Sequence, residues 1–500
     1  MQVARDDANM LGGLDDDVDE AAAADGRGRG QAGAGEADDE DVDDAAAVVK
    51  YDYYLERFRT FDLAFGKPEV DSCATCDEFK LKIAACEDED AAADLREARR
   101  KHLLEADRGY AMRRFDHDLA KASRKSDPAW VCPAPDYKLW DGTEYMCSDM
   151  AGVLQTPKVP TNKAFYLRKQ RTFCYGMFSG QADRHSMSFW DETVSNKGAN
   201  EVISAAHNFL VMRRTGATKL AWWADNTSSQ IKNWVWMLFT NEVARDDGFG
   251  FFDRVDGKFS PPGHTFMVHI GLITCSSPTR TRNTHPPTAQ ENDRAFGVLS
   301  RAAKKTKVIA SSKSWMRLAA KAKGQSDPYH TAWLDRSTFR DWKKYLDERY
   351  ERPSVWTNTD GDTVPLMKIR WFNFGVGEQT AAGGAVALVA HPDEVWYRLS
   401  LDASEPWKKI ALVRRAGAGG VISDAEYDLH TAALTLPPEK VADLAKMKKW
   451  LPREFHALYP DPRAPPASEN ESDESDESDV SASDAGASDD ARSGEDEEAA

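Results

Sequence analysis

The sequence predicts an α/β protein in which a mixed sheet is flanked by helices. Two observations predict this fold class. Between residues 140 and 307, short apolar runs with strand-like alternation are interleaved with segments of helical periodicity. Ahead of them, residues 51–130 carry charged segments with helical periodicity and few helix breakers. The chain has 500 residues, of which 41% are hydrophobic, so it can build a sizeable core and hold two or three domains.

Both ends of the sequence are predicted to be disordered acidic tails. Residues 1–48 are rich in Ala, Asp and Gly, and residues 464–500 set Ser among acids. Residues 1–50 carry a net charge of −11 and residues 464–500 a net charge of −13, which leaves +6 for residues 51–463. The segment 464–500 is either a solubilising tail or a phosphorylatable one, which contacts basic partners or masks the basic core. Its acceptors would be Ser472, Ser475 and Ser478.

The elements are expected in a fixed order. Residues 51–130 form helices, the last of which ends at Asp127–Pro128. The core over 140–307 then holds alternating strands and helices. Strands are expected over 144–154, 164–179, 185–193, 219–226 and within 251–266, and helices over 198–216, 228–246 and 292–307. The order β-β-β-α-β-α-β-α is that of the ribonuclease-H-like fold.

Residues 308–459 are expected to form a C-terminal α+β region. A helix over 335–350 is predicted to be capped near Asp335 or Ser337. Strands are predicted over 364–375 and 394–402, and a last helix pair over 441–459 is split at Pro452.

Three carboxylates occupy the positions at which a ribonuclease-H-like core holds metal. Asp149 lies on the first strand, Asp225 closes the very apolar fourth strand, and Asp293 lies on the last helix. Two Mg²⁺ or Mn²⁺ ions held by such oxygen ligands would activate the attacking group and stabilise the leaving oxygen of a phosphodiester. The plain alternatives are a helix cap for Asp225, an ordinary strand-end residue for Asp149 and a surface residue for Asp293.

Several motifs resemble a transposase-like family of eukaryotic mobile elements with a DDE/D-type core. They lie within residues 70–375, and ADNTSSQIKN is the most specific of them. The motifs are CATCD (73–77), SDMAGVLQTPKVP (148–160), FWDET (189–193), ADNTSSQIKN (224–233), GHT (263–265) and DRAFG (293–297). The resemblance implies that Asn226, Gln230, Asn233 and His264 contact the substrate or orient the metal ligands. A buried core histidine is the alternative for His264.

The chain departs from the family pattern in two places. Family members carry an acid soon after Phe-Gly, where this chain has about Ser300, so the third ligand is either Asp293 or missing. The spacing between GHT and DRAFG is also too long. The segment 268–290 begins with Val and ends with Gln, whose codons can form the two ends of an intron, and its 23 residues keep the reading frame. We predict a retained intron; a genuine long loop is the alternative.

Cys73 and Cys76 form a C-x-x-C half-site for zinc. His102, His117, Cys86 and Cys132 are candidates to complete the site, and the family resemblance favours His102. Ordinary thiols on a helical domain are the alternative. Seven Cys, an odd number, argue against a disulfide framework and favour a reducing compartment.

A basic segment follows the last core helix. From Arg301 to Lys323 there are eight Lys or Arg residues and no acid, a pattern suited to DNA phosphates, although a solvated helix face would look the same. The residues predicted to contact DNA are Arg168, Lys169, Arg171, Lys304, Lys305, Lys307, Lys313 and Arg317.

The sequence thus predicts metal-dependent DNA cleavage and strand transfer by an enzyme or its decayed descendant. A non-catalytic, domesticated nuclear protein that binds DNA or chromatin is the alternative, and an acidic-tailed chromatin protein with an unrelated α/β core is a third. Location in the nucleus and basic nuclear partners for the acidic tails are expected. No stretch of about 20 apolar residues predicts a membrane span.

Overall fold

The computed structural model describes residues 73–124, 140–261, 291–324, 328–380, 386–417 and 421–460, together with positions 53, 57 and 60. The chain divides into two compact units, 1–68 and 69–500, and the description below concerns the second. The predictions for both tails, the segment 268–290, His264, Cys132 and Asp127–Pro128 lie outside the described residues. None of the described helices is long and apolar enough to cross a membrane.

The predicted α/β class with a mixed sheet is confirmed. Ten of the described strands form one sheet, whose order is β12-β11-β8-β6-β5-β1-β3-β4-β7, with β2 paired to β3. The first five of these strands along the chain are β1 (Trp140–Met150), β2 (Leu154–Thr156), β3 (Gln170–Ser179), β4 (Arg184–Asp191) and β5 (Ala217–Ala224). The others are β6 (Arg254–Phe259), β7 (His330–Trp333), β8 (Trp371–Phe374), β11 (Glu394–Arg398) and β12 (Lys408–Ala411). A separate hairpin pairs β9 (Val376–Thr380) with β10 (Val386–Ala390).

The centre of the sheet combines both kinds of strand pairing. β3 is antiparallel to both β1 and β4, whereas β1, β5 and β6 run parallel to one another. Strands from residues 308–459 extend both edges: β8 pairs with β6, and β7 pairs with β4. The C-terminal α+β region therefore completes the sheet that the core begins.

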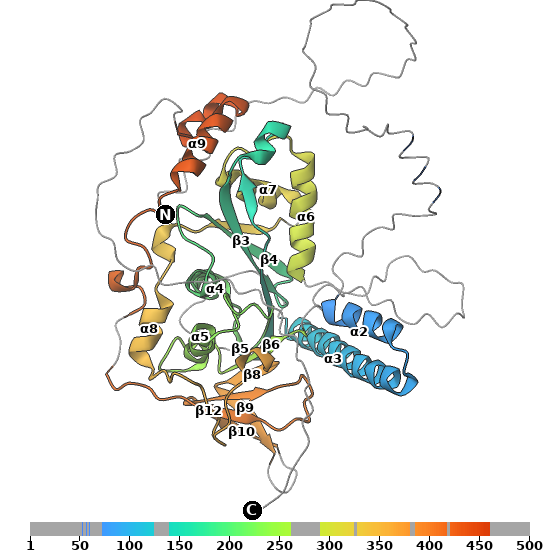
Figure 1. The fold of residues 1–500 in the computed structure, drawn as a ribbon. Helices are drawn as coiled ribbons and strands as arrows, with labels where there is room; N and C mark the ends of the chain where they lie inside the picture. Colours follow the sequence, from blue (N-terminus) through green and yellow to red (C-terminus); the bar gives the residue numbers. More distant parts are fainter. Residues whose placement is uncertain are drawn as a thin grey trace, which may run out of the picture. The chain divides into compact units, whose positions relative to one another are not determined.

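Helices cover the two faces of this sheet (Figure 1). The described helices are α2 (Ala74–Ala85), α3 (Glu89–Ala122), α4 (Ala199–Arg213), α5 (Trp234–Ala244), α6 (Glu291–Lys305), α7 (Ser312–Ala322), α8 (Trp342–Arg349) and α9 (Pro438–Met447). Helices α4, α5 and α8 pack on one face of the sheet, and α3, α6 and α7 pack on the other. Short 3-10 turns lie at Asn162–Tyr166, Arg336–Thr338, Leu366–Lys368, Ala425–Tyr427, Lys448–Trp450 and Arg453–Leu458.

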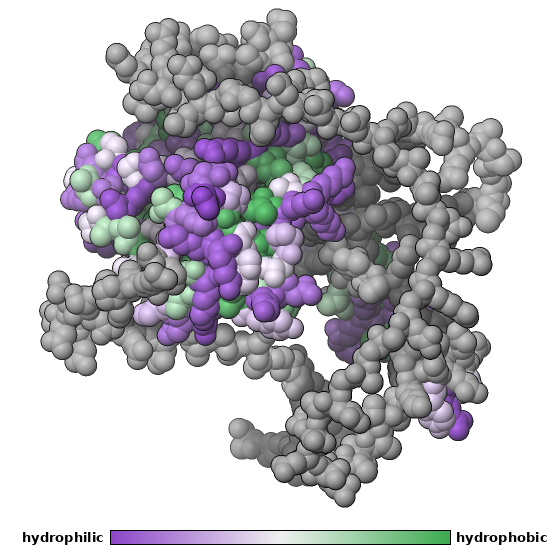
Figure 2. Space-filling model, turned by 90° about the horizontal axis from the view of Figure 1, so that it is seen from above, coloured by the Kyte–Doolittle hydropathy of each residue, from purple (hydrophilic) through white to green (hydrophobic). Residues whose placement is uncertain are grey.

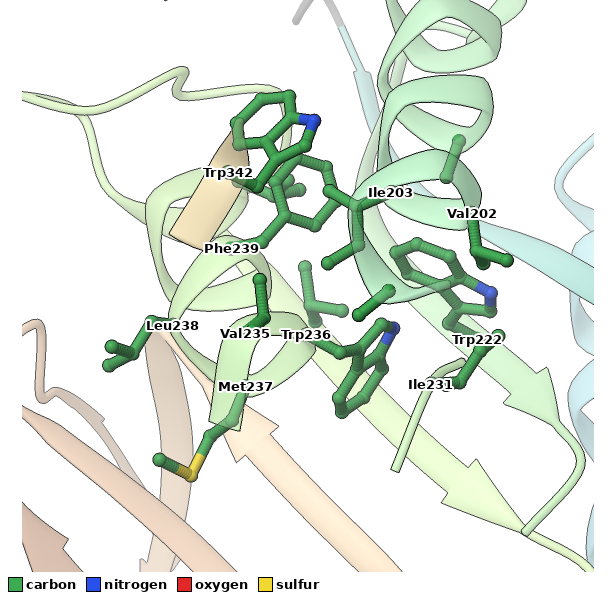
Figure 3. Packing of buried hydrophobic residues seen from close by; sticks show 14 of the residues in the cluster. Val202, Ile203, Trp222, Ile231, Val235, Trp236, Met237, Leu238, Phe239 and Trp342 are labelled. Atoms are coloured by element: carbon green, nitrogen blue, oxygen red, sulfur yellow. The ribbon is translucent and has the colours of Figure 1, made fainter. Parts of the chain in front are cut away.

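Neighbouring strand residues point to opposite faces, as the period of two requires. Trp222 of β5 joins the largest apolar cluster, with α4, α5 and α8, whereas Trp223 packs with α3. Figure 3 shows how densely the face that carries α4, α5 and α8 is filled. Ile203, Phe239 and Trp342 point toward one another from these three helices. These three side chains are fully buried and together remove a large apolar area from water, so this cluster supplies much of the fold's stability.

Several predicted boundaries were wrong, each for a local reason. Residues 162–166 form a 3-10 turn that buries Ala164, so β3 starts at Gln170 and not at 164. The helix expected from 335 begins at Trp342, because Asp341 accepts a hydrogen bond from the amide of Lys344 and caps it there. After Pro452 a 3-10 turn replaces the second helix of the pair.

Candidate functional site

Asp149 and Asp225 lie at the same edge of the sheet. β1 and β5 are parallel neighbours, and their register pairs Ser148 with Ala224, the residues just before the two aspartates. Asp149 shares the alternation of Tyr145 and Cys147, which pack on the α3 side, and Asp225 shares that of Trp223. Both carboxylates are therefore directed to the face on which α3 and α6 lie.

The amino end of α6 is fixed directly over this edge. Asn292 is buried, and its Nδ2 donates to the carbonyl oxygens of Cys147 at 2.9 Å and Gly176 at 3.2 Å. Gly176 pairs with Asp149 across β1 and β3, and a Cβ there would meet Phe296 Cζ at 2.8 Å. The helix can approach this closely only because residue 176 has no side chain. This packing brings Asp293, in the first turn of α6, to the aspartates.

The three carboxyl groups interact electrostatically. The pKa of Asp149 is held well above its ordinary value by burial first, then by the charges of Asp225 and Asp293 and by a hydrogen bond with the Asp293 side chain. The amide of Met150 opposes this shift by donating to Asp149 Oδ1 at 2.7 Å. Carboxylates in such mutual repulsion favour either a shared proton or a bound cation.

A buried lysine that the sequence did not single out supports the segment after Asp225. Lys232 Nζ donates to Asn226 Oδ1 at 2.6 Å and to the carbonyl of Met367, and Arg370 also donates to Asn226 Oδ1 at 3.2 Å. Burial, with the charge of Arg370, lowers the pKa of Lys232 to about 7. Asn226 thus receives two cationic donors, and its own Nδ2 donates to Ser260. The only sequence signal was a lysine inside the ADNTSSQIKN motif.

The other implied residues have different positions. Asn233 is the cap of α5, because its Oδ1 accepts from the amide of Trp236 at 3.0 Å. Gln230 lies half-buried in the turn before that helix. Ser300 is exposed, seven residues along α6 from Asp293, so the acid that interacts with Asp149 is Asp293.

A cavity of about 700 Å³ opens beside the amino end of α6. Arg113 and Arg114 from α3 and Arg294 from α6 line it, together with Glu291. Glu291 accepts a hydrogen bond from Tyr145 Oη at 3.0 Å, and His185 Nε2 lies 2.9 Å from its carbonyl oxygen. The volume of the cavity is in the range of ligand pockets, and its lining combines these arginines with the acids Glu291, Asp118 and Asp183.

The predicted DNA-binding residues fall into two groups. Arg168 and Arg171 have acidic partners within the chain, Asp443 at 3.3 Å and Glu192 at 3.9 Å. Lys169 is half-buried, and burial lowers its pKa. The remaining five are exposed on α6, on α7 or between them: Lys304, Lys305, Lys307, Lys313 and Arg317.

Cys73, Cys76 and His102 form a cluster suited to a metal ion. Their ligand atoms all lie within 4.8 Å of one another, and Cys73 Sγ is 3.3 Å from His102 Nε2. Cys73 caps α2 and Cys76 lies in its first turn, so both thiols face α3, which carries His102. Burial, followed by the nearby Cys73, raises the pKa of Cys76 to about 11.

The two candidate sites differ in spacing. Among the described residues, Cys73, Cys76 and His102 are the group of three whose ligand atoms lie within 4.8 Å of one another, and the three aspartates do not form such a group.

Comparison of the chain with protein-family models, curated proteins and solved structures gave no match.

Proposed function

We propose that the chain is a transposase-like enzyme that cleaves and joins DNA phosphodiesters with Mg²⁺ or Mn²⁺ held by Asp149, Asp225 and Asp293. The observation that carries the proposal is the juxtaposition of these three acids, which come from positions up to 144 residues apart in the chain. Acids repel one another, so their gathering at one half-buried place, where they raise the pKa of Asp149, supports a functional role.

The order of the elements supports a ribonuclease-H-like core. Leaving out the short β2, the chain runs β1, β3, β4, α4, β5, α5, β6, α6, which is the β-β-β-α-β-α-β-α order. In that arrangement the acids stand at the carboxyl ends of the parallel strands β1 and β5 and on the closing helix.

The chemistry divides between metal and protein. Bound divalent ions would activate the attacking oxygen and stabilise the leaving one. The three aspartates would hold the ions, and Lys232 with Arg370 would keep Asn226, and thereby the turn after Asp225, in place. The exposed cations of α6 and α7 would bind the DNA backbone, in keeping with a nuclear protein.

Nicking of supercoiled plasmid by the full chain tests the proposal. We expect nicking with Mn²⁺ or Mg²⁺ but not with Ca²⁺ or EDTA, and its loss in Asp225→Asn. The exposed acid Glu351 gives a matched control, Glu351→Gln, which should retain activity. DNA binding without nicking under any divalent ion would leave the non-catalytic binding protein as the function.

We also propose that Cys73, Cys76 and His102 bind zinc as a structural ion. Two thiolates and one imidazole match three of the four ligands that zinc takes in proteins. The ion would join α2 to α3, and it would relieve the cost of keeping two buried thiols side by side.

Zinc content and helix stability test this second proposal together. The purified chain should carry about one zinc per molecule, and Cys76→Ser should remove it and increase amide hydrogen exchange in α2. Cys174→Ser is the control, because Cys174 is buried in the sheet away from the cluster. Metal-free protein with α2 equally protected would contradict the assignment.

A further inference from the structure

A basic groove runs between α6 and α7. It has a volume of about 760 Å³, an apolar floor that includes Leu318, and a basic rim. The rim cations are Arg301, Lys304, Lys305, Lys321 and Lys323. All five are exposed. Figure 2 shows the molecule from above the view of Figure 1, the end at which α6, α7 and α9 are drawn. Hydrophilic residues predominate on this face.

Four of the five rim cations have no ion pair within the described part of the chain. They are Arg301, Lys304, Lys305 and Lys321. Arg168 and Arg171, by contrast, are both paired. Like charges this close repel one another, so an anionic occupant of the groove would be bound favourably.

The described chain ends close to this groove. Tyr459 is buried and its hydroxyl donates to the carbonyl of Ala310, which directly precedes Ser311, the cap of α7. Lys321 lies near the other end of that helix, about 16 Å away at 1.5 Å per residue. The described chain therefore ends at residue 460 near the amino end of α7, and the carboxyl end of the same helix helps to form the rim.

The segment beyond has the opposite charge at a matching distance. Residues 469–479 hold seven acids and no base, and Ser472, Ser475 and Ser478 lie among them. The nine residues 461–469 can reach at most about 30 Å, at roughly 3.3–3.6 Å per residue. The first acid of the run therefore starts within reach of the rim.

We propose that residues 469–479 of this chain dock in the α6–α7 groove. A single exposed ion pair contributes little, but several pairs formed by a tethered segment benefit from an effective concentration in the millimolar range. Because the same cations are the candidates for DNA backbone binding, the docked segment would compete with DNA. Phosphorylation at the three serines would add about −1.5 to −2 charges each and strengthen docking. The docking itself does not depend on the chemistry of the aspartates.

Zero-length carbodiimide crosslinking of the full chain, mapped by mass spectrometry, tests the contact. We expect the carboxylates of 469–479 to link to Lys321 and Lys323 within one molecule, and 0.5 M NaCl to reduce these links at least fivefold. The variant Arg301→Glu/Lys304→Glu leaves Lys321 and Lys323 in place and should reduce their links by a similar factor. The control Lys449→Glu/Arg453→Glu reverses two exposed cations nearer to the segment along the chain and should leave the links unchanged.

Three outcomes would overturn the proposal. Links spread over all exposed lysines, or links found only between two molecules, would show that the segment does not bind in the groove. Links to Lys321 and Lys323 that persist in the groove variant would exclude charge recognition. Neutralising the acids of 469–479 with no gain in duplex DNA affinity would leave the groove to DNA alone. Loss of nicking in Asp225→Asn, tested separately, bears on none of these results.

Discussion

Strand β1 carries two acids in contrasting surroundings. In the middle of the strand, Glu144 is fully buried and accepts hydrogen bonds from Ser179 Oγ at 2.9 Å, Thr215 Oγ1 at 2.8 Å and the amide of Gln181 at 3.1 Å. Near its carboxyl end, Asp149 is half-buried and has two further carboxyl groups as neighbours. Burial raises the pKa of both, to about 7 for Glu144.

The difference separates an acid that supports the fold from one suited to bind a ligand. Neutral donors satisfy Glu144 within the protein, so it needs nothing from outside. Asp149 accepts a hydrogen bond from the amide of Met150, but its other neighbours include two acids, and a cation is the partner that such a cluster accepts. A raised pKa alone does not identify a functional acid; the kind of neighbour does.

The largest expected effect is on activity. Asp149→Asn should reduce metal-dependent nicking at least 100-fold, because it removes a charged ligand from the metal site. Glu144→Gln, the matched change in the middle of the same strand, should keep nicking within about threefold. Steady-state nicking rates at equal protein and Mn²⁺ concentrations measure both, and equal losses would break the contrast between the two acids.

A third buried acid extends the comparison to an ion pair. Asp116 of α3 accepts from Lys258 Nζ at 2.7 Å and from Trp223 Nε1 at 2.8 Å, and this joins α3 to β5 and β6. Lys258→Met should cost about 3–5 kcal/mol of unfolding free energy, because it leaves Asp116 buried without its cation. Urea unfolding measures the loss. Lys258→Met with Asp116→Asn should recover part of it, and no recovery would place the cost elsewhere.

The pH dependence of stability should identify Glu144. Folding favours its protonated form, because its pKa rises from 4.5 unfolded to about 7 folded. The stability it contributes is complete below pH 4.5 and declines as pH rises through 7, by about 3 kcal/mol in total. Glu144→Gln should lose this decline and be the more stable protein at pH 8. Urea unfolding at pH 5, 6.5 and 8 gives the comparison, and parallel pH profiles would refute the assignment.

The smallest expected effect tests the packing of α6 against Gly176 of β3. In Gly176→Ala the new Cβ would lie 2.8 Å from Phe296 Cζ and 3.0 Å from Asn292 Oδ1, so the helix must move. We expect the free energy of unfolding to fall by about 1–3 kcal/mol. Nicking should also fall, because Asp293 moves with α6. Gly152→Ala, which meets nothing within 4 Å, is the control. Lower stability with normal nicking would separate α6 from the site.

By itself the sequence determined much of the local structure. The alternation in β1, the apolar run of β5 and the periodicity of α6 are set by neighbouring residues, so the strands, the helices and the three aspartates could be assigned before any contact was known. The strand β3 was placed too early, because a 3-10 turn and a strand share the same apolar residues there.

Tertiary structure alone decided the rest. Several contacts join residues whose pairing cannot be seen in the periodicity of the sequence. They are Asn292 with Gly176, Lys232 with Asn226, Asp443 with Arg168 and Tyr459 with Ala310. Local patterns record which face of an element is buried, whereas such contacts depend on how distant elements pack. For this reason the sequence could name Asp149, Asp225 and Asp293, and only the packing of α6 on β1 and β3 could bring them together.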